Sequence, residues 1–272
     1  MGFFTDKITI VTGGASGIGR GLVEELARRG AIITLADINI ELAEEVAAAV
    51  TKAGGSIKAV KLDVTDYKAV KALVDSTVAE CARLDYMFNN AGVAIFGEAR
   101  DYSYEDWRKV IDVDFFGPVN GAIASYPVMV KQGFGHIINT ASLAGLVPAA
   151  HLASYVASKH GVVGLSQALH IEGADLGVKV SVICPGLIQT PIYNSRTIKL
   201  DQEKMIERAP KGLSPEKCAR VILKGIEKNK PIILVTAAAK IFYTLYRISP
   251  GIILRLGLHI MKNFRREFRV EK

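Results

Sequence analysis

The feature that most constrains the fold is an alternation of short, uninterrupted apolar runs with longer segments of helical periodicity. Uninterrupted runs are typical of strands buried on both faces, and strands that alternate with helices form a parallel sheet covered on both sides. The runs predict strands at residues 7–12, 31–36, 57–62, 84–88, 135–140 and 178–184. The segments between and after them predict helices at residues 18–30, 38–50, 66–81, 104–130, 154–175 and 215–228.

We therefore predict an α/β fold with one doubly wound, Rossmann-type parallel sheet of about seven strands and a C-terminal helical extension. Half of the 272 residues are apolar and 22% are charged, so the chain can bury a large core and is not generally disordered. No segment offers about 20 continuous apolar residues, so no membrane span is expected. The first residues also lack the pattern of a secretory signal.

The three cysteines are widely spaced and form no C-x-x-C pair, which argues against a disulfide framework and a thiolate metal site. They favour a reducing compartment, and we expect a cytoplasmic protein without a metal ion. The net charge of +7 is concentrated at the C-terminus, because only 26 Lys/Arg and 25 Asp/Glu precede Pro231. A nearly neutral body of this kind predicts no nucleic-acid partner.

A glycine-rich turn, TGGASGIG at residues 12–19, joins the first predicted strand to the first predicted helix. Such a turn lets backbone amides and the positive end of a helix approach a pyrophosphate. Its glycine spacing differs from G-x-G-x-x-G, and a tight turn without a ligand is the alternative.

Asp37 follows the second predicted strand, 18 residues after Gly19, where a carboxylate can accept hydrogen bonds from an adenosine ribose. It would repel a 2′-phosphate, and Ser16 and Ile38 stand where an Arg could bind one. NAD is therefore expected rather than NADP. The alternative role for Asp37 is a helix N-cap, for which Asn39 competes.

A possible proton-transfer group lies at the start of the predicted helix 154–175. Tyr155 and Lys159 are four residues apart, so they share one helix face, and an ammonium beside a phenol lowers the phenol's pKa. Ser142 follows the fifth predicted strand at the ligand-binding end of such a sheet. The alternatives are a solvated helix face for the Tyr/Lys pair and a loop or capping hydroxyl for Ser142.

Together these motifs resemble the short-chain dehydrogenase/reductase family over about residues 5–235. The resemblance is carried by TGGASGIG, Asp37, Asp63-Val64, Asn89-Asn90-Ala91-Gly92, Ser142, Tyr155-x-x-x-Lys159 and Pro185-Gly186. It implies that Tyr155 is the general acid/base, that Ser142 stabilises the carbonyl oxygen, and that Lys159 supports Tyr155 and holds the nicotinamide ribose. It also implies contacts to NAD from Gly13, Ser16, Gly17, Ile18, Gly19, Asp37, Asp63, Val64, Asn90, Ala91, Gly92, Tyr155, Lys159, Pro185, Gly186, Ile188 and Thr190.

One residue departs from the family pattern. Asp114 stands where the family usually has an Asn that supports a water relay from Lys159, largely through a backbone carbonyl. We leave Asp114 out of the catalytic set, but a carboxylate there can raise the pKa of Lys159 and shift the pH–rate profile.

The family resemblance implies a dinucleotide-binding and catalytic domain at residues 1–235, with an insertion at 187–213 that closes over substrate. An apolar pocket is expected from Val93, Ile95, Phe96, Leu143, Leu146, Val147, Leu187, Ile192 and Tyr193, with His151 as a wall or surface residue. This composition indicates a lipophilic secondary alcohol or ketone, such as a steroid, a long-chain alcohol or an aryl carbinol. The alternatives are a 3-oxoacyl-thioester reductase and a non-catalytic dinucleotide sensor.

The extension at residues 236–272 contains a predicted amphipathic helix that starts at Ser249-Pro250. Its basic stripe is Arg255, His259, Lys262, Arg266 and Arg269, and its apolar stripe is Ile253, Leu256, Ile260, Phe264 and Phe268. Such a helix can lie on an anionic membrane, or it can pack on its own body or a neighbouring subunit. The family resemblance suggests a homodimer or homotetramer through the helices that begin at Tyr104 and Ser154.

Overall fold

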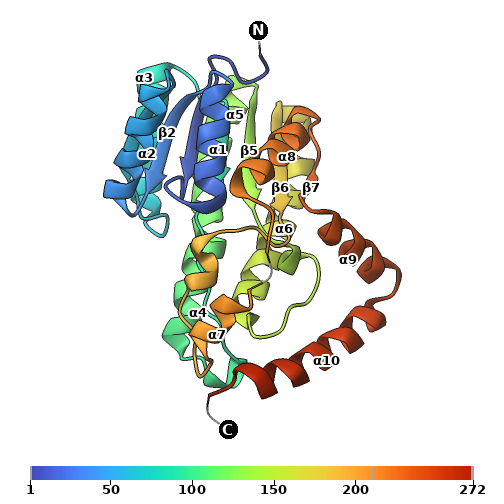
Figure 1. Cartoon of the computed structure of the whole chain (residues 1–272). Helices are drawn as coiled ribbons and strands as arrows, with labels where there is room; N and C mark the ends of the chain where they lie inside the picture. The colour runs from blue at the N-terminus through green and yellow to red at the C-terminus, as the bar shows by residue number, and fades with distance from the viewer. Residues whose placement is uncertain (1, 210, 271–272) are drawn as a thin grey trace.

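The computed structural model describes residues 2–209 and 211–270 (Figure 1). Met1 and Pro210, and Glu271 with Lys272, fall in predicted segments but lie outside the described residues. Within the described residues one parallel sheet has seven strands in the order β3-β2-β1-β4-β5-β6-β7. Their bounds are β1 Ile8–Thr12, β2 Ile32–Asp37, β3 Ser56–Lys61, β4 Tyr86–Asn89, β5 Gly135–Thr140, β6 Val178–Cys184 and β7 Ile232–Leu234. The predicted fold class is confirmed, and β7 is the strand that the sequence pattern did not locate.

The strand order reverses between β1 and β4, and this reversal positions the site. The chain runs outward from β1 to β3, returns to pair β4 with the other side of β1, and then continues to β7. Helices that connect the strands on either side of such a switch point leave a crevice at the carboxyl ends of the strands.

Helices cover both faces of the sheet. On one face α1 (Gly17–Arg28), α2 (Ile40–Lys52) and α8 (Pro215–Glu227) bury apolar residues such as Leu22, Val46 and Ile222 against the strands. On the other, α3 (Tyr67–Cys81), α5 (Gly117–Gln132) and α6 (Ala153–Glu172) pack on β1, β4, β5 and β6. Burial of both faces explains the uninterrupted apolar runs in the sequence.

The predicted helix at 104–130 is not continuous. It is α4 (Tyr104–Ile111), a π-helical turn η2 (Asp112–Phe116) and then α5. A π turn inserts an extra residue into a helix and re-aims its side chains, and such turns are frequent at functional sites. Here the turn directs Asp114 inward, where the residue is fully buried.

The C-terminal arm consists of α9 (Ala237–Ile248) and α10 (Pro250–Phe268). It leaves the sheet after β7 and returns across the lower end of the molecule, beside α7 (Gln202–Glu207) (Figure 1). The shorter segments are η1 (Ala99–Asp101), η3 (Leu143–Gly145), η4 (Ala174–Leu176) and η5 (Pro191–Asn194). The arm therefore links the last strand to the loops that follow β4 and β6.

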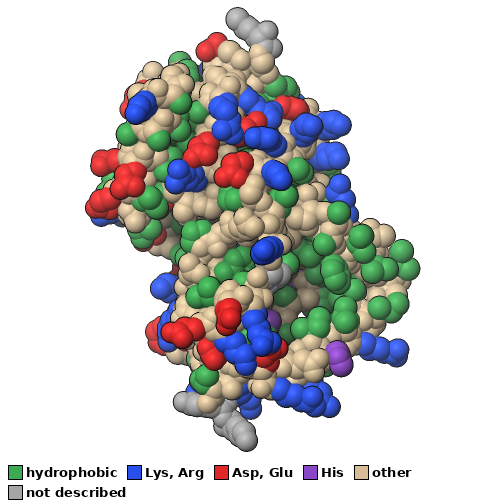
Figure 2. Space-filling model, in the orientation of Figure 1, with side chains coloured by type: hydrophobic (Ala, Val, Ile, Leu, Met, Phe, Trp, Pro, Cys, Tyr) green, Lys and Arg blue, Asp and Glu red, His purple; other side chains and the backbone are tan. Residues whose placement is uncertain are grey.

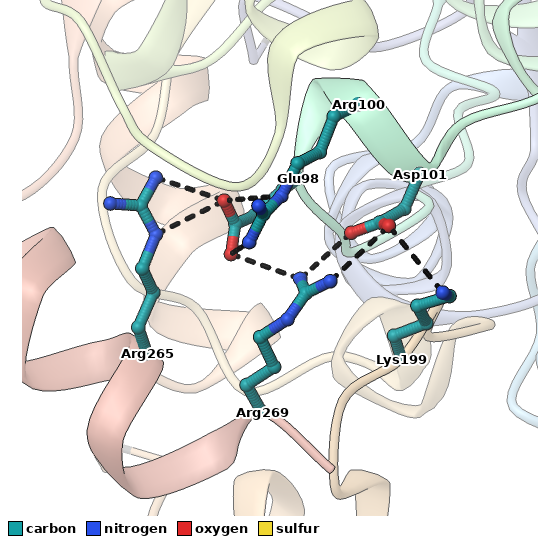
Figure 3. Close-up of polar contacts among 6 residues, drawn as sticks. All are labelled: Glu98, Arg100, Asp101, Lys199, Arg265 and Arg269. Carbon is teal, nitrogen blue, oxygen red and sulfur yellow. Dashed lines mark hydrogen bonds and ion pairs between the residues drawn. The ribbon is translucent and has the colours of Figure 1, made fainter. Parts of the chain in front are cut away.

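An ionic cluster fastens the far end of α10 to the segment after β4 (Figure 3). Arg265 donates two hydrogen bonds to Glu98, at 2.9 and 3.0 Å, and Arg269 donates to Glu98 at 3.0 Å and to Asp101 at 2.8 Å. Hydrogen bonds from Arg265 hold the pKa of Glu98 below its usual range, and those from Arg269 do the same for Asp101. The cluster is therefore charged at neutral pH and weakens as the pH falls through these lowered values.

Replacing Arg269 should loosen the arm without unfolding the sheet. In Arg269→Ala we expect amide hydrogen exchange in α10 to be about fivefold faster or more, because Asp101 and Glu98 lose a shared partner. Arg255→Ala is the matched control, since no carboxylate of residues 2–209 or 211–270 lies within ion-pair distance of Arg255. Equal exchange rates in the two variants would show that the cluster does not fasten the arm.

Candidate active site

The carboxyl ends of the central strands open into one cavity of about 1170 Å³. It is lined by the predicted catalytic residues Ser142, Tyr155 and Lys159, and by every predicted cofactor residue except Gly19. Gly19 lies on α1 against the turn that precedes the helix, where an added Cβ would come within 1.9 Å of the Gly13 carbonyl oxygen. Its role is close packing of helix and turn.

The glycine-rich turn has a backbone that only glycine adopts easily. Gly13 and Gly17 have positive φ angles of 62° and 51°, and a Cβ on Gly13 would lie 2.7 Å from the Ala91 Cα. Asn90 fixes the turn by donating from its side chain to the Thr12 and Gly13 carbonyls, each at 3.2 Å. The turn thus presents the N-terminus of α1 to the cavity, as an anionic phosphate requires.

Asp37 ends β2 and faces the cavity. Its two oxygens accept hydrogen bonds from the Ala15 and Asn39 amides, both at 3.0 Å. Asn39, not Asp37, caps α2 by accepting from the Leu42 amide. The capping alternative for Asp37 is therefore wrong, and its carboxylate is held beside the glycine-rich turn.

Lys159 is fixed by three groups from different elements. Its Nζ donates to the Thr140 carbonyl oxygen at 3.1 Å, lies 3.0 Å from an Asp114 carboxylate oxygen, and stands 5.3 Å from the centre of the Tyr155 ring. The Lys159 residue is only 2% exposed, so the alternative of a solvated helix face is wrong. Ser142 accepts from the Ala144 amide at 3.1 Å, and its hydroxyl acts to lower the pKa of Tyr155.

Burial and charge compete at these groups. Burial alone would lower the pKa of Lys159, but Asp114 and Tyr155 outweigh it and raise that pKa, so the amine stays protonated. Burial raises the pKa of Tyr155 above its ordinary value, and Asp114 adds to the rise, whereas Lys159 and Ser142 oppose it. The expected effect of Lys159 is present, but it does not outweigh the burial of the phenol.

Asp114 is a site residue that the sequence analysis left out of the catalytic set. Besides Lys159, its carboxylate accepts a hydrogen bond from the Val93 amide at 2.7 Å. The contact with Lys159 is made by the side chain and not by a backbone carbonyl. The one sequence feature that pointed to Asp114 was the Asp in place of the family's usual Asn. The π turn that directs its side chain toward Lys159 was not visible in the hydrophobic periodicity.

The other end of the cavity is mostly apolar. Of the predicted pocket residues, Ile95 and Leu146 belong to the core, and the rest line the cavity. The apolar stripe of α10 also lines it, so this face of the helix packs over its own body. Leu152, Met205 and Phe242 also line it, and of these Phe242 is the residue that sequence reasoning missed. Segment 187–213 contributes η5 and α7 beside this end.

His151 is an unusual residue in this wall. Its φ is +53°, and its ring stacks on Phe264 of α10 with the ring centres 4.0 Å apart. Burial lowers the pKa of His151 to about 4, so the ring is neutral at physiological pH. Among residues 2–209 and 211–270, His, Cys, Asp and Glu form no cluster of three or more that could bind a metal ion.

A model of the short chain dehydrogenase family matches residues 7–201, which is more than half of the chain. The chain belongs to the short-chain dehydrogenase family. It is 35% identical to the cyclohexanol dehydrogenase of Acinetobacter sp. over 224 residues, which cover 80% of this chain and 87% of that protein. It is 34% identical to SadH of Mycobacterium tuberculosis, named a putative oxidoreductase, over 263 residues, which cover 94% and 95% of the two chains.

A crystal structure of a short-chain dehydrogenase/reductase from Burkholderia phymatum in complex with NAD matches this fold with a TM-score of 0.85 and 28% identity. The match covers 93% of this chain and 96% of that one. In the described part of this short-chain dehydrogenase, no helix combines the length and apolarity that a membrane span needs.

Removing the Asp114 charge should shift the pH dependence of this dehydrogenase. Because Asp114 raises the pKa values of both Tyr155 and Lys159, Asp114→Asn lowers them, and the rising limb of alcohol oxidation should move to lower pH. The pH–rate profile measures this shift. Asp112→Asn is the control, since Asp112 lies in the same π turn but pairs with Arg108 at 2.8 Å. A profile unchanged by Asp114→Asn would contradict the assignment.

Proposed function

We propose that this short-chain dehydrogenase transfers a hydride between NAD and a lipophilic secondary alcohol or ketone. The observation that carries the proposal is the convergence of Ser142, Tyr155 and Lys159 in one cavity, between the glycine-rich turn and an apolar wall. Proton-transfer groups placed between a phosphate-binding turn and an apolar pocket suit a reaction that moves a proton and a hydride.

The residues present fit NAD. The turn at Gly13 and Gly17 leaves room for a pyrophosphate at the N-terminus of α1, and Asp37 is positioned to accept from ribose hydroxyls. Asp63 and Val64 would contact the adenine, Asn90, Ala91 and Gly92 the adenosine side, and Ile188 and Thr190 the carboxamide. Two features support NAD over NADP. The Asp37 carboxylate would repel a 2′-phosphate, and positions 16 and 38 hold Ser and Ile instead of a basic residue that could bind one. NAD in the Burkholderia phymatum structure supports the same choice.

In alcohol oxidation the Tyr155 oxygen takes the proton of the substrate hydroxyl, and in ketone reduction it returns one. The Ser142 hydroxyl donates a hydrogen bond to the substrate oxygen as charge develops there. Lys159 stabilises the Tyr155 phenolate and holds ribose hydroxyls, and Asp114 holds Lys159. NAD, when bound, supplies the hydride acceptor.

The apolar cavity wall supports a lipophilic substrate such as a steroid, a long-chain secondary alcohol or an aryl carbinol. Similarity to a cyclohexanol dehydrogenase supports a secondary alcohol. A 3-oxoacyl-thioester reductase is disfavoured because such enzymes generally use NADPH, which Asp37 repels. A dinucleotide sensor is disfavoured because it has no use for a lysine and a carboxylate buried beside Tyr155, which are costly to desolvate.

The same proposal assigns roles to the segments. Residues 1–235 form the dinucleotide-binding and catalytic domain, residues 187–213 close over substrate, and residues 236–272 complete the wall. We propose a homodimer or homotetramer through α4, the π turn η2, α5 and α6, where Phe116 of η2, Ile123 of α5 and Ile171 of α6 are exposed. The three free cysteines support a reducing compartment such as the cytoplasm.

Tyr155→Phe tests the reaction. Loss of the phenol oxygen removes the acid/base group, so kcat for cyclohexanol or a long-chain secondary alcohol should fall about 10²- to 10⁴-fold. NAD binding, followed by protein fluorescence, should persist because the ring and the glycine-rich turn remain. Retention of most of the wild-type kcat would rule out this role for Tyr155.

A double substitution tests the cofactor choice. In Asp37→Ala/Ile38→Arg the carboxylate is gone and a guanidinium can pair with a 2′-phosphate, so the ratio of kcat/KM for NADP over NAD should rise about 100-fold. Single Ile38→Ala serves as the control that keeps Asp37. If wild type already prefers NADP, the cofactor proposal is wrong.

A further inference from the structure

The outer surface of the C-terminal arm exposes large apolar side chains to solvent. We define the outer arm surface as Ile241, Leu245, Ile248, Ile252 and Leu258, and all five are exposed. Ile248 and Leu258 are the most exposed of them, at 76% and 73%. Hydrophobic side chains gather over α9 and α10 on this side of the molecule (Figure 2). A concentration of exposed large apolar side chains of this kind indicates a binding surface.

The charges beside this surface have one sign. The sequence contains no Asp or Glu from Lys228 to Arg266, whereas Lys240, Arg247, Arg255, Lys262 and Arg266 are all exposed there. Among the described residues no carboxylate lies within ion-pair distance of these five cations. The arm therefore combines exposed apolar residues with uncompensated positive charge, which is the composition of a helix that lies on an anionic bilayer.

The opposite side of the arm faces the cavity. Ile253, Leu256, Ile260 and Phe264 of α10 line it. Leu256 and Ile260 are also open to solvent, so α10 borders the mouth of the substrate end of the cavity. The ionic cluster at Arg265 and Arg269 fixes one end of α10, and α9 joins the other end to β7. A surface that binds the outer side of α10 is therefore next to the apolar end of the cavity.

We propose that the outer arm surface docks this dehydrogenase on an anionic phospholipid bilayer, with α9 and α10 lying in the headgroup region. The exposed apolar side chains would enter the acyl boundary, and the cations would meet lipid phosphates. Docking is independent of the proposed reaction. Delivery of a lipophilic alcohol from the bilayer to the cavity beneath α10 is a further step that rests on the proposed function.

A second copy of the chain is a poorer occupant of this surface. A two-fold contact pairs the same patch with itself, so the cations of one arm would face those of the other without a carboxylate to neutralise them. The exposed apolar residues Phe116, Ile123 and Ile171 lie on other elements and leave a separate face for such a contact. Charge complementarity thus favours the bilayer.

Vesicle sedimentation tests the docking. Wild-type protein should pellet with phosphatidylcholine vesicles that contain about 30% phosphatidylserine, and far less of it should pellet with vesicles of pure phosphatidylcholine. In about 0.5 M salt, less protein should pellet with the anionic vesicles than at low salt, because the attraction is partly electrostatic. In Ile248→Glu the partition coefficient should fall about tenfold or more. Leu176→Glu is the control, because Leu176 is a large apolar residue of η4 that is 44% exposed and lies neither on the arm nor among the residues proposed for the oligomer contact, so this variant should bind as wild type does.

Three results of these vesicle and light-scattering experiments would contradict bilayer docking. Wild-type protein that stays in the supernatant with anionic vesicles overturns the proposal, as does an Ile248→Glu variant that pellets like wild type. A loss of oligomer mass in Ile248→Glu, measured by light scattering in a protein that ignores vesicles, would assign the surface to a second copy.

Turnover of a vesicle-borne substrate distinguishes docking of the protein on the bilayer from delivery of the alcohol to the cavity. With a long-chain secondary alcohol carried in anionic vesicles, wild type should be several-fold faster than Ile248→Glu, whereas both should oxidise cyclohexanol in buffer at equal rates. Equal rates on the vesicle-borne alcohol would overturn delivery while sedimentation still reports docking. Failure of wild type on cyclohexanol and the vesicle-borne alcohol alike would count against the proposed reaction and leave the docking result standing.

Discussion

The buried ion pair between Lys159 and Asp114 is the interaction on which the site depends. Lys159 comes from α6, and Asp114 comes from the π turn between α4 and α5. Lys159 also donates to the Thr140 carbonyl at the end of β5, which makes β5 the third element of the contact. Two charges without solvent are tolerated only if each has good partners, so these three elements are held in a fixed relation. Tyr155 takes its position and its electrostatic surroundings from that relation.

The Gly-rich turn and the C-terminal arm impose different constraints on the same cavity. The turn must keep a particular backbone, because a side chain at Gly13 would collide with Ala91. The arm needs only an apolar inner stripe and two arginines that reach Glu98 and Asp101. One wall is therefore determined by backbone geometry, and the other by the pattern of side chains on a helix.

The parts of this molecule that were predictable are those with a strong local signal. The strands are continuous apolar runs, and the turn, Ser142 and Tyr155-x-x-x-Lys159 have recognisable spacing, so the parallel sheet and the grouping of these residues followed from sequence. The π turn at Asp112–Phe116 did not, because one extra residue in a single turn leaves the hydrophobic spacing close to that of an ordinary helix. Strand β7 has three residues and too little pattern of its own. The apolar stripe of α10 was predicted from its spacing, but the surface against which it packs depends on how the chain folds back and could not be read from the sequence.

The family match ends at residue 201, whereas α10 supplies a wall of the substrate end of the cavity. The residues that we propose to bind the dinucleotide and to transfer the proton all lie within this family match, whereas α9 and α10 follow it. Mutations in the arm can reshape what enters the cavity while leaving the redox apparatus intact. Substrate preference can therefore change through substitutions in α9 and α10 while the residues proposed for catalysis stay the same.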